Sequence, residues 1–352
     1  MALQTAFIPY TLDFKFDART SRGLISQHQV YFIKLWHAPD PTIVGLGECA
    51  PLAGLSIDYR PDLLQKLENV CQTINAGKAE TINPDKLELQ EWPAIGFALE
   101  TALLDLQNGG NRQIYKNAFS NGETGIPING LVWMGDKDFM QQQISQKLAQ
   151  GYSCLKLKIG GLDFTTELEI LQSIRETASE KELTIRVDAN GAFAPDEAFK
   201  KLERLAKYNI HSIEQPIKQG QWKAMEELCA YTPVPIALDE ELIGVQAPDK
   251  QAELLETINP QYIILKPTLV GGLKASADWI ELAEKRSIGW WMTSALESNI
   301  GLNAISQFTA NYSLTMPQGL GTGQLYHNNI ASPLQIEQGK LWYREKQEWG
   351  QL

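Results

Sequence analysis

The sequence has few of the residues that mark secreted, zinc-binding or membrane-spanning proteins. Its four cysteines lie far apart in 352 residues, which is typical of reduced, buried thiols rather than a disulfide framework. The four histidines form no cluster with the spacing of zinc ligands. No run approaches ~18 consecutive apolar residues, and residues 1–17 lack the pattern of a secretory signal. We therefore expect a cytoplasmic protein without a membrane span.

The chain also has fewer basic than acidic residues. Lysine and arginine total 31 against 42 aspartates and glutamates, which gives a net charge of −11, and no basic run offsets it. This balance argues against nucleic acid or an anionic membrane surface as a partner. Apolar residues make up 43% of the chain and charged residues 21%, which indicates a globular protein with ample material for a core. The length predicts roughly two domains.

Two different patterns divide the chain. Up to about residue 120 the pattern is mixed, because residues 29–36 alternate like an antiparallel strand whereas Pro61–Ala76 and Pro93–Leu106 have helical spacing. The segment Asn108–Thr124 is rich in glycine, asparagine and serine and favours a domain boundary.

From Ile126 onward, short apolar strands alternate with amphipathic helices, which predicts a parallel sheet. Two of the expected helices are Phe164–Glu180 and Pro195–Tyr208. The expected strands are Ile126–Leu131, Cys154–Ile159, Thr184–Asp188, Ile210–Glu214, Ile236–Asp239, Tyr262–Lys266 and Trp290–Thr293.

Five successive strands carry a charged residue at or near their ends: Lys158, Asp188, Glu214, Asp239 and Lys266. The intervals are 30, 26, 25 and 27 residues, each the length of one strand–helix unit. An open sheet would scatter these ends along a line, whereas a closed parallel barrel gathers them around one mouth. The spacing therefore favours a barrel that brings the five charges together.

The three acids of this set favour a metal site. Asp188, Glu214 and Asp239 would repel one another strongly unless a cation neutralised them. Ligation by oxygen alone suits a hard cation, and a site with open positions for water and substrate indicates Mg²⁺, for which Mn²⁺ can substitute. Taken singly, each acid could instead cap a turn or pair with a lysine.

The lysines of the set suit proton transfer beside a carboxylate. Lys156 and Lys158 share one strand face, and Lys266 lies across the expected barrel from them. Inward-facing lysines are costly to bury, so they need either structural ion pairs with the acids or a chemical role. Lysines on both sides of a metal suit an enzyme that removes a proton from the carbon next to a carboxylate. The metal would hold that carboxylate. The expected substrate is therefore a small-molecule carboxylate.

Other polar residues surround these charges. Arg186 and Asn190 share the strand face of Asp188, so a polar row runs up that strand. Glu240 follows Asp239 directly and must point differently from it, which favours a supporting role over metal ligation.

These motifs together resemble the enolase superfamily, in its muconate-lactonizing branch. The segments that carry the resemblance are Lys156-Leu157-Lys158, Asp188-Ala189-Asn190, Glu214-Gln215-Pro216, Asp239-Glu240 and Lys266-Pro267. The resemblance implies an α/β fold, a modified (β/α)7β TIM-type barrel over residues 123–325 with an N-terminal α+β capping domain over residues 1–122. Residues 326–352 would pack back on the capping domain.

The resemblance also implies roles for individual residues. Asp188, Glu214 and Asp239 would ligate the metal, and Lys158 and Lys266 would be the acid/base pair. The residues expected to contact substrate are Lys156, Arg186, Asn190, Ser294, Glu297, Ser298, Gly54 and Leu55. Loops at residues 20–23 and 51–55 would form the lid over the barrel mouth.

Within the branch, three less specific segments are most similar to dehydratases of menaquinone biosynthesis. They span residues 47–52, 293–301 and 319–323. The implied reaction is loss of water from a succinylated hydroxycyclohexadiene carboxylate to give an aromatic acid. Lys158 would remove the α-proton and return it to the departing hydroxyl, while Lys266 would stabilise the enediolate by its charge alone.

Other activities stay open. Racemisation of N-succinylamino acids or epimerisation of dipeptides needs the same metal and lysines. A dipeptide's ammonium usually needs late acidic partners, and no aspartate follows Asp278. Lyases for acid sugars are disfavoured because residues 290–301 contain no histidine, and a catalytically silent binding protein is disfavoured because all five charged positions are filled. A homo-oligomer is an open alternative to a monomer.

Overall fold

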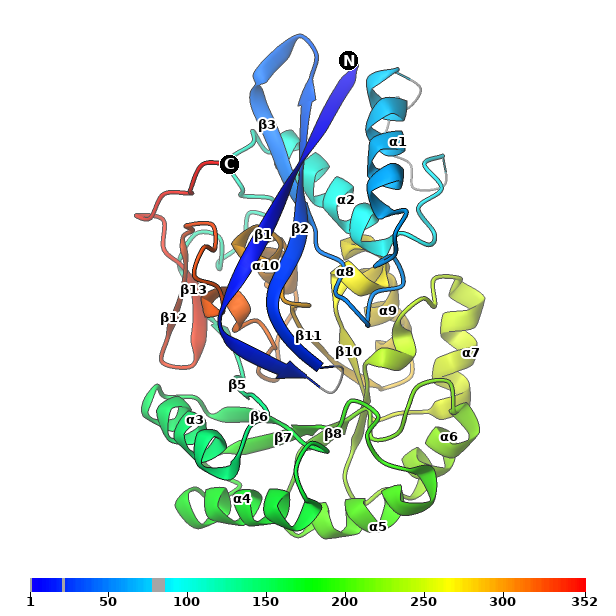
Figure 1. The fold of residues 1–352 in the computed structure, drawn as a ribbon, viewed down its shortest axis with the longest axis vertical. Helices are drawn as coiled ribbons and strands as arrows, with labels where there is room; N and C mark the ends of the chain where they lie inside the picture. Colours follow the sequence, from blue (N-terminus) through cyan, green and yellow to red (C-terminus); the bar gives the residue numbers. More distant parts are fainter. Residues whose placement is uncertain (1, 21–22, 78–85) are drawn as a thin grey trace.

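The computed structural model describes residues 2–20, 23–77 and 86–352. An antiparallel sheet with two helices forms the N-terminal part, and a barrel of parallel strands surrounded by helices forms most of the rest (Figure 1). The long strands of the N-terminal sheet run down toward the barrel, so the two parts pack against each other.

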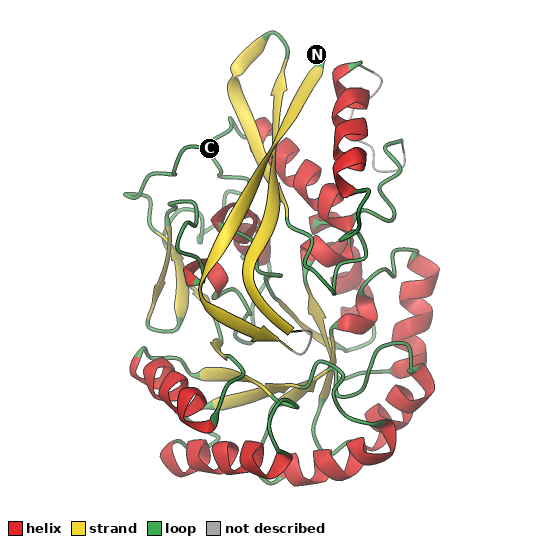
Figure 2. Cartoon of the chain, in the orientation of Figure 1, coloured by secondary structure: helices red, strands yellow, loops and turns green. Residues whose placement is uncertain are grey.

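The N-terminal sheet has the order β1-β2-β3 and is drawn in yellow in Figure 2. Its strands are β1 (Leu3–Thr20), β2 (Gly23–His37) and β3 (Asp40–Cys49), and its helices are α1 (Leu63–Asn75) and α2 (Pro93–Gln107). The predicted strand and both predicted helices are therefore confirmed. Helix α2 lies so close to β3 that a Cβ added at Gly47 would overlap the Ala98 carbonyl oxygen, so only glycine fits there.

The parallel sheet has the order β11-β10-β9-β8-β7-β6-β5. These strands are β5 (Gly130–Val132), β6 (Cys154–Lys158), β7 (Thr184–Asp188), β8 (Ser212–Glu214), β9 (Ile236–Leu238), β10 (Tyr262–Leu265) and β11 (Gly289–Met292). The segment Gln318–Gly319 closes the barrel, because Gln318 bridges Ile128 and Gly319 bridges Thr293. The predicted barrel architecture is confirmed.

Helices cover the outside of the barrel. They are α3 (Lys137–Ala149), α4 (Phe164–Thr177), α5 (Pro195–Ala206), α6 (Trp222–Tyr231), α7 (Pro248–Ile258), α8 (Pro267–Val270), α9 (Leu273–Glu284) and α10 (Asn299–Thr309), with short 3₁₀ helices η1 (Glu240–Leu242) and η2 (Thr322–Gln324). The predicted helices in the α4 and α5 regions are confirmed, and each ends two or three residues before the predicted boundary.

One predicted strand is divided in two. The run Ile126–Leu131 forms β4 (Ile126–Pro127), which pairs with β13 (Lys340–Tyr343) outside the barrel, and the first residues of β5, which belongs to the barrel. Between them the backbone changes partner, because Ile128 N donates to Gly339 O whereas Asn129 N donates to Gln318 O. An apolar run cannot reveal such a change of partner.

The C-terminal residues contact both parts of the molecule. Strands β12 (Leu334–Glu337) and β13 (Lys340–Tyr343) form a small sheet with β4. Tyr326 bridges Phe14 of β1, and Lys34 Nζ of β2 donates to the Leu352 carbonyl at 2.8 Å. The segment that starts at Tyr326 therefore ties the N-terminal sheet to the barrel.

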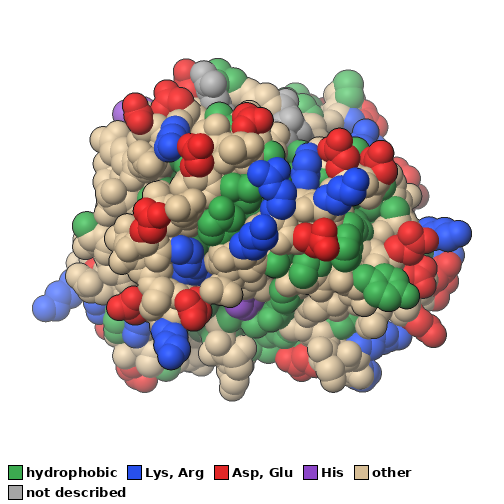
Figure 3. Space-filling model, turned by 90° about the horizontal axis from the view of Figure 1, so that it is seen from below, with side chains coloured by type: hydrophobic (Ala, Val, Ile, Leu, Met, Phe, Trp, Pro, Cys, Tyr) green, Lys and Arg blue, Asp and Glu red, His purple; other side chains and the backbone are tan. Residues whose placement is uncertain are grey.

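The surface carries charges of both signs. Acidic and basic side chains are interspersed on the face seen in Figure 3, with hydrophobic side chains between them. Within the described ranges, no helix has the length and apolar character needed to cross a bilayer.

Candidate active site

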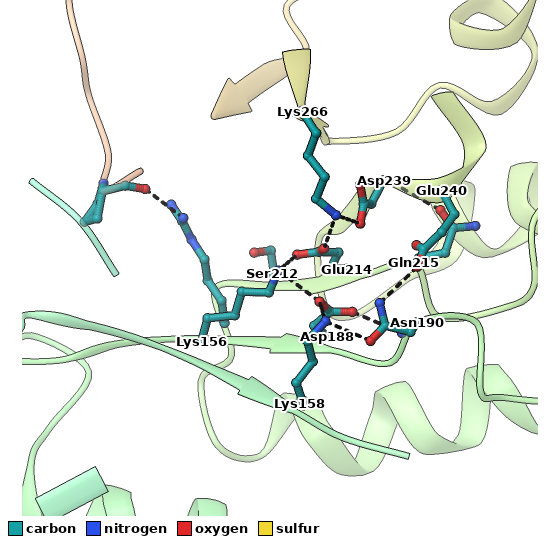
Figure 4. Close-up of polar contacts among 12 residues, drawn as sticks. Lys156, Lys158, Asp188, Asn190, Ser212, Glu214, Gln215, Asp239, Glu240 and Lys266 are labelled. Carbon is teal, nitrogen blue, oxygen red and sulfur yellow. Dashed lines mark hydrogen bonds and ion pairs between the residues drawn. The ribbon is translucent and has the colours of Figure 1, made fainter. Parts of the chain in front are cut away.

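Charged side chains from neighbouring strands meet at one end of the barrel (Figure 4). The Lys158 ammonium nitrogen lies 2.6 Å from an Asp188 carboxylate oxygen, and that of Lys156 lies 2.9 Å from the same oxygen. Lys156 also forms an ion pair with Glu214. The structure thus brings together the ends of β6, β7 and β8.

The other side of the cluster comes from β9 and β10. Lys266 follows β10 and forms an ion pair with Asp239, which follows β9. The Lys266 ammonium nitrogen is also 3.9 Å from a Glu214 oxygen. Because β6 and β10 lie on either side of β7, β8 and β9, Lys158 and Lys266 approach the carboxylates from opposite sides.

Strand register explains why these side chains share the barrel interior. Lys158 is opposite Asp188 in the β6–β7 ladder, and Asp188 is opposite Glu214 in the β7–β8 ladder. Side chains alternate along a strand, so Leu155 and Leu157 point the other way and lie in the hydrophobic core. The packing of the leucines holds the lysine face of β6 toward the site.

Burial and mutual charge set the protonation of the cluster. Burial would raise the pKa of Asp188, but the ammonium groups of Lys156 and Lys158 outweigh it and hold that pKa below its usual range. Burial, reinforced by the Asp188 charge, raises the pKa of Glu214 well above its usual range. Burial would lower the pKa of Lys266, yet nearby carboxylates raise it overall. Further positive charge at this point would favour the ionised carboxylates.

The three carboxylates have the chemistry of a divalent-cation site. Oxygen donors suit a hard cation, and among the described residues the charged partners of the two Glu214 oxygens are the ammonium groups of Lys156 and Lys266. Among the described residues, however, no three acidic, histidine or cysteine side chains are already arranged around one point as metal ligands. Lysine ammonium groups lie among the oxygens instead. The residues fit a metal if Lys156 and Lys266 draw back from the carboxylates.

Asn190 holds Lys158 against Asp188. The Lys158 ammonium donates to Asn190 Oδ1 at 2.8 Å, and Asn190 Nδ2 donates to Glu240 Oε1 at 2.9 Å. The second bond fixes which end of the amide faces the lysine. Glu240 therefore supports the position of the Lys158 ammonium through Asn190.

Two cavities meet at Lys158 and Asn190. The inner one, of about 130 Å³, is also lined by Lys156, Lys266, Leu55, Ser294 and Leu296. The outer one, of about 1130 Å³, is wider and reaches Gly54. These residues are therefore placed where a substrate could touch them. Of the expected lid, Ser21 and Arg22 lie outside the described residues.

Three residues expected to contact substrate are not among those that line these cavities. Arg186 is 1% exposed, donates to the Pro317 carbonyl at 2.8 Å and stacks on the Trp291 ring. Glu297 is fully buried, and Ala295 N donates to it at 2.7 Å. Ser298 is fully buried too. Arg186 is held by the Pro317 carbonyl and the Trp291 ring, and Glu297 and Ser298 are hydrogen-bonded inside the protein, so a contact of these three residues with substrate stays a prediction.

Glu48 engages Ser298 and was missed by sequence reasoning as a functional position. This carboxylate is near the end of β3 and accepts hydrogen bonds from Ser298 N, Ser298 Oγ and Gly301 N at 2.8, 2.6 and 2.8 Å. It thereby caps the N-terminus of α10 from the other domain. The sequence feature that could have identified Glu48 is an acidic residue at the end of an otherwise apolar strand segment, Val44–Cys49.

Contacts close to the Glu48–Ser298 hydrogen bonds also hold part of the cavity wall in place. Leu296 lines the inner cavity and has a left-handed backbone conformation, with φ of 69°. Its carbonyl accepts hydrogen bonds from Tyr326 Oη at 2.6 Å and lies 3.1 Å from His28 Nδ1. Residues of the N-terminal domain and of the C-terminal segment therefore hold this strained residue in place.

Glu48→Gln should change how stability depends on pH. Burial, only partly offset by the Ser298 and Gly301 donors, raises the pKa of Glu48 to about 7. Between about pH 4.5 and 7 the folded protein keeps a proton that the unfolded chain has released, so wild-type stability falls as pH rises. Glutamine has no such proton. The free energy of unfolding of the variant, relative to wild type, should rise by about 2 kcal/mol from pH 5 to pH 8.

Urea denaturation of both proteins at the two pH values measures this difference. Glu91→Gln, at a carboxylate that is 75% exposed, is the matched control and should show no such change. An equal Glu48→Gln effect at both pH values would contradict the assignment of a raised pKa to Glu48.

Comparison with known proteins defines the class of this chain. Residues 140–347 match the family of enolase C-terminal domain-like proteins. The chain belongs to this family and thus to the enolase superfamily, whose enzymes generally use a divalent metal.

Individual relatives narrow this class. The chain is 47% identical to o-succinylbenzoate synthase of Desulfotalea psychrophila, over 94% of this chain and 96% of that protein. The crystal structure of MenC from the same organism covers 97% of this chain and 100% of its own, with a TM-score of 0.86 and 44% identity. The dipeptide epimerase of Enterococcus faecalis, solved with Mg and L-Leu-L-Tyr, shares the fold with a TM-score of 0.81 at 19% identity, over 99% of each chain.

Proposed function

We propose that the chain is an o-succinylbenzoate synthase, which converts 2-succinyl-6-hydroxy-2,4-cyclohexadiene-1-carboxylate to o-succinylbenzoate and water in menaquinone biosynthesis. The observation that carries the proposal is the pair Lys158 and Lys266, which face each other across three buried carboxylates. Its support from relatives is the 47% identity to a synthase of this activity.

Lys158 is the proposed base. Its ammonium nitrogen lies at the junction of the two cavities, held by Asp188 and Asn190, so its deprotonated form can face a bound substrate. It takes the proton from the carbon next to the ring carboxylate. The C–O bond to the ring hydroxyl then breaks, a new C=C bond completes the aromatic ring, and the same lysine protonates the departing oxygen to give water.

Asp188, Glu214 and Asp239 are the proposed ligands of a Mg²⁺ ion, for which Mn²⁺ can substitute. When bound, this ion supplies positive charge to the substrate carboxylate while the neighbouring carbon loses its proton. Lys156 contributes a further positive charge beside Asp188 and Glu214. Lys266 faces the carboxylates from the far side and stabilises negative charge there.

The remaining assignments follow from the sequence. We propose residues 1–122 as a capping domain, 123–325 as the catalytic barrel and 326–352 as a segment that joins them. We also propose a cytoplasmic enzyme for a small carboxylate, with neither nucleic acid nor membrane as a partner, and we assign no oligomeric state.

Racemisation of N-succinylamino acids is a second candidate. Lys158 and Lys266 both line the inner cavity, and racemisation requires proton transfer on both faces of a carbon. The N-succinylamino acid racemase of Amycolatopsis is 24% identical over 92% of the chain and 87% of that protein.

Lys266→Arg separates the two activities. Arginine keeps the positive charge but stays protonated, so it cannot act as a base. Dehydration should persist at a reduced rate because the larger side chain fits less well, whereas racemisation of N-succinylamino acids should disappear. Both reactions are assayed on the variant and wild type. A wild-type enzyme that racemises efficiently but does not dehydrate the cyclohexadiene would overturn the proposed function.

A further inference from the structure

The inner cavity contains a fourth lysine that the proposed reaction does not use. Lys147, on α3, lines this cavity together with Asn129 and Tyr152. Its aliphatic chain crosses Gly130 of β5, where an added Cβ would lie 3.1 Å from Lys147 Cδ. Its ammonium nitrogen lies 5.0 Å from the centre of the Tyr152 ring. The glycine thus leaves room for a charged side chain at the cavity wall.

Lys147 differs from the other three lysines of the cavity in its surroundings. Lys156, Lys158 and Lys266 each form an ion pair with a carboxylate. Among the described residues, none forms an ion pair or a hydrogen bond with the Lys147 ammonium, and burial lowers its pKa. An ammonium group that is partly withdrawn from water and lacks a counter-ion is stabilised when an anion binds beside it.

Asn129 adds a second unsatisfied group at the same place. Asn129 is 5% exposed, and within the described part of the chain its Oδ1 atom has no hydrogen-bond partner, so no bond to that oxygen fixes the side-chain amide in one orientation. The oxygen accepts hydrogen bonds and cannot hold an anion, but the amide nitrogen donates and can bind a carboxylate. Tyr152 precedes β6 and Lys158 ends it, so Lys147 lies toward the opposite end of that strand from the reacting groups.

We propose that Lys147 and Asn129 form a subsite for a second carboxylate of the substrate, the one at the end of its succinyl arm. This inference rests on the proposed function, whose substrate carries one carboxylate at the reacting ring and another on that arm. With one anionic end at the metal site and the other at Lys147, the cavity selects dicarboxylates. The same positive charge repels the ammonium group of a dipeptide and so disfavours dipeptide epimerisation.

The test compares two ligands that differ only at the arm. Binding of o-succinylbenzoate and of its arm carboxamide is measured by calorimetry with Mg²⁺ present, on wild type, Lys147→Met and Lys147→Arg. Lys137→Met is the matched control, because Lys137 is on the same helix, is paired with Glu169 and is not among the residues that line either cavity. We expect Lys147→Met to weaken binding of the acid at least tenfold and to leave binding of the carboxamide unchanged. Lys147→Arg should retain most of the acid's affinity.

The outcomes separate the subsite from the proposed function. Equal losses for acid and carboxamide in Lys147→Met would mean a structural role, and equal affinity of wild type for both would mean that no such subsite exists. If wild type neither dehydrates the cyclohexadiene nor binds o-succinylbenzoate, the proposed function fails. In that case N-succinylphenylalanine and its arm carboxamide replace o-succinylbenzoate and its carboxamide as ligands. The same comparison of wild type with Lys147→Met then shows whether Lys147 binds the arm carboxylate.

Discussion

Lys158→Ala is expected to abolish dehydration, with a loss of about 10³-fold or more. A positioned acid–base group contributes about 10²–10⁴-fold to a rate, and here one lysine would remove the proton and also protonate the departing hydroxyl. Among the described residues on this side of the cavity, the other lysine is Lys156, and it is held between Asp188 and Glu214, so it should not replace Lys158 as the base. Formation of the aromatic product measures the rate, and deuterium exchange at the α-carbon reports on proton removal.

Two further variants make this result interpretable. Lys158→Met keeps the aliphatic chain and should be as inactive as the alanine variant, with a normal melting temperature. Lys250→Ala removes a lysine that is exposed on α7 and should leave the rate unchanged. Dehydration by Lys158→Ala at a near wild-type rate would overturn the assignment of the base.

We also expect removal of divalent metal to abolish activity and added Mg²⁺ or Mn²⁺ to restore it. Three buried carboxylates on adjacent strands repel one another, so a bound cation should both activate and stabilise the protein. Glu214→Gln should lower activity by at least about 10³-fold, since Glu214 ends β8, between the strands that lead to the other two proposed ligands, and glutamine removes its negative charge.

Metal binding is measured directly by titration calorimetry with Mn²⁺ and by the rise in melting temperature that Mg²⁺ causes. Glu214→Gln should lose both signals. Glu253→Gln, at an exposed carboxylate on α7, is the control and should keep them. Full activity in exhaustively chelated wild-type protein would rule out the metal site.

The barrel could be predicted because its sequence pattern is local and regular. Each strand is short and apolar, each is followed by an amphipathic helix, and charged residues recur at about one strand–helix interval. The alternation of side chains along β6 places Lys156 and Lys158 on one face without any knowledge of the rest of the chain. Local rules therefore sufficed to bring lysines and carboxylates together.

The cavity wall could not be predicted in the same way. Spacing gives the side of a strand or loop on which a residue lies, but not which distant group covers it. Glu297 and Ser298 follow β11 like substrate-contacting residues, yet Glu48 reaches Ser298 across 250 positions of sequence. Arg186 shares a strand face with Asp188 but lies deeper, where Trp291 and the Pro317 carbonyl engage it.

The capping of α10 by Glu48 limits how far these proteins can be treated as modular. A chimera that joins this barrel to a relative's N-terminal domain keeps the donors Ser298 N and Gly301 N, but inherits whatever residue the donor domain has at the position of Glu48. Without a matching acceptor, the start of α10 and the adjacent loop that holds Leu296 would lose their anchor. Engineers who recombine domains to change substrate preference should therefore exchange Glu48 and residues 294–301 as a single cassette.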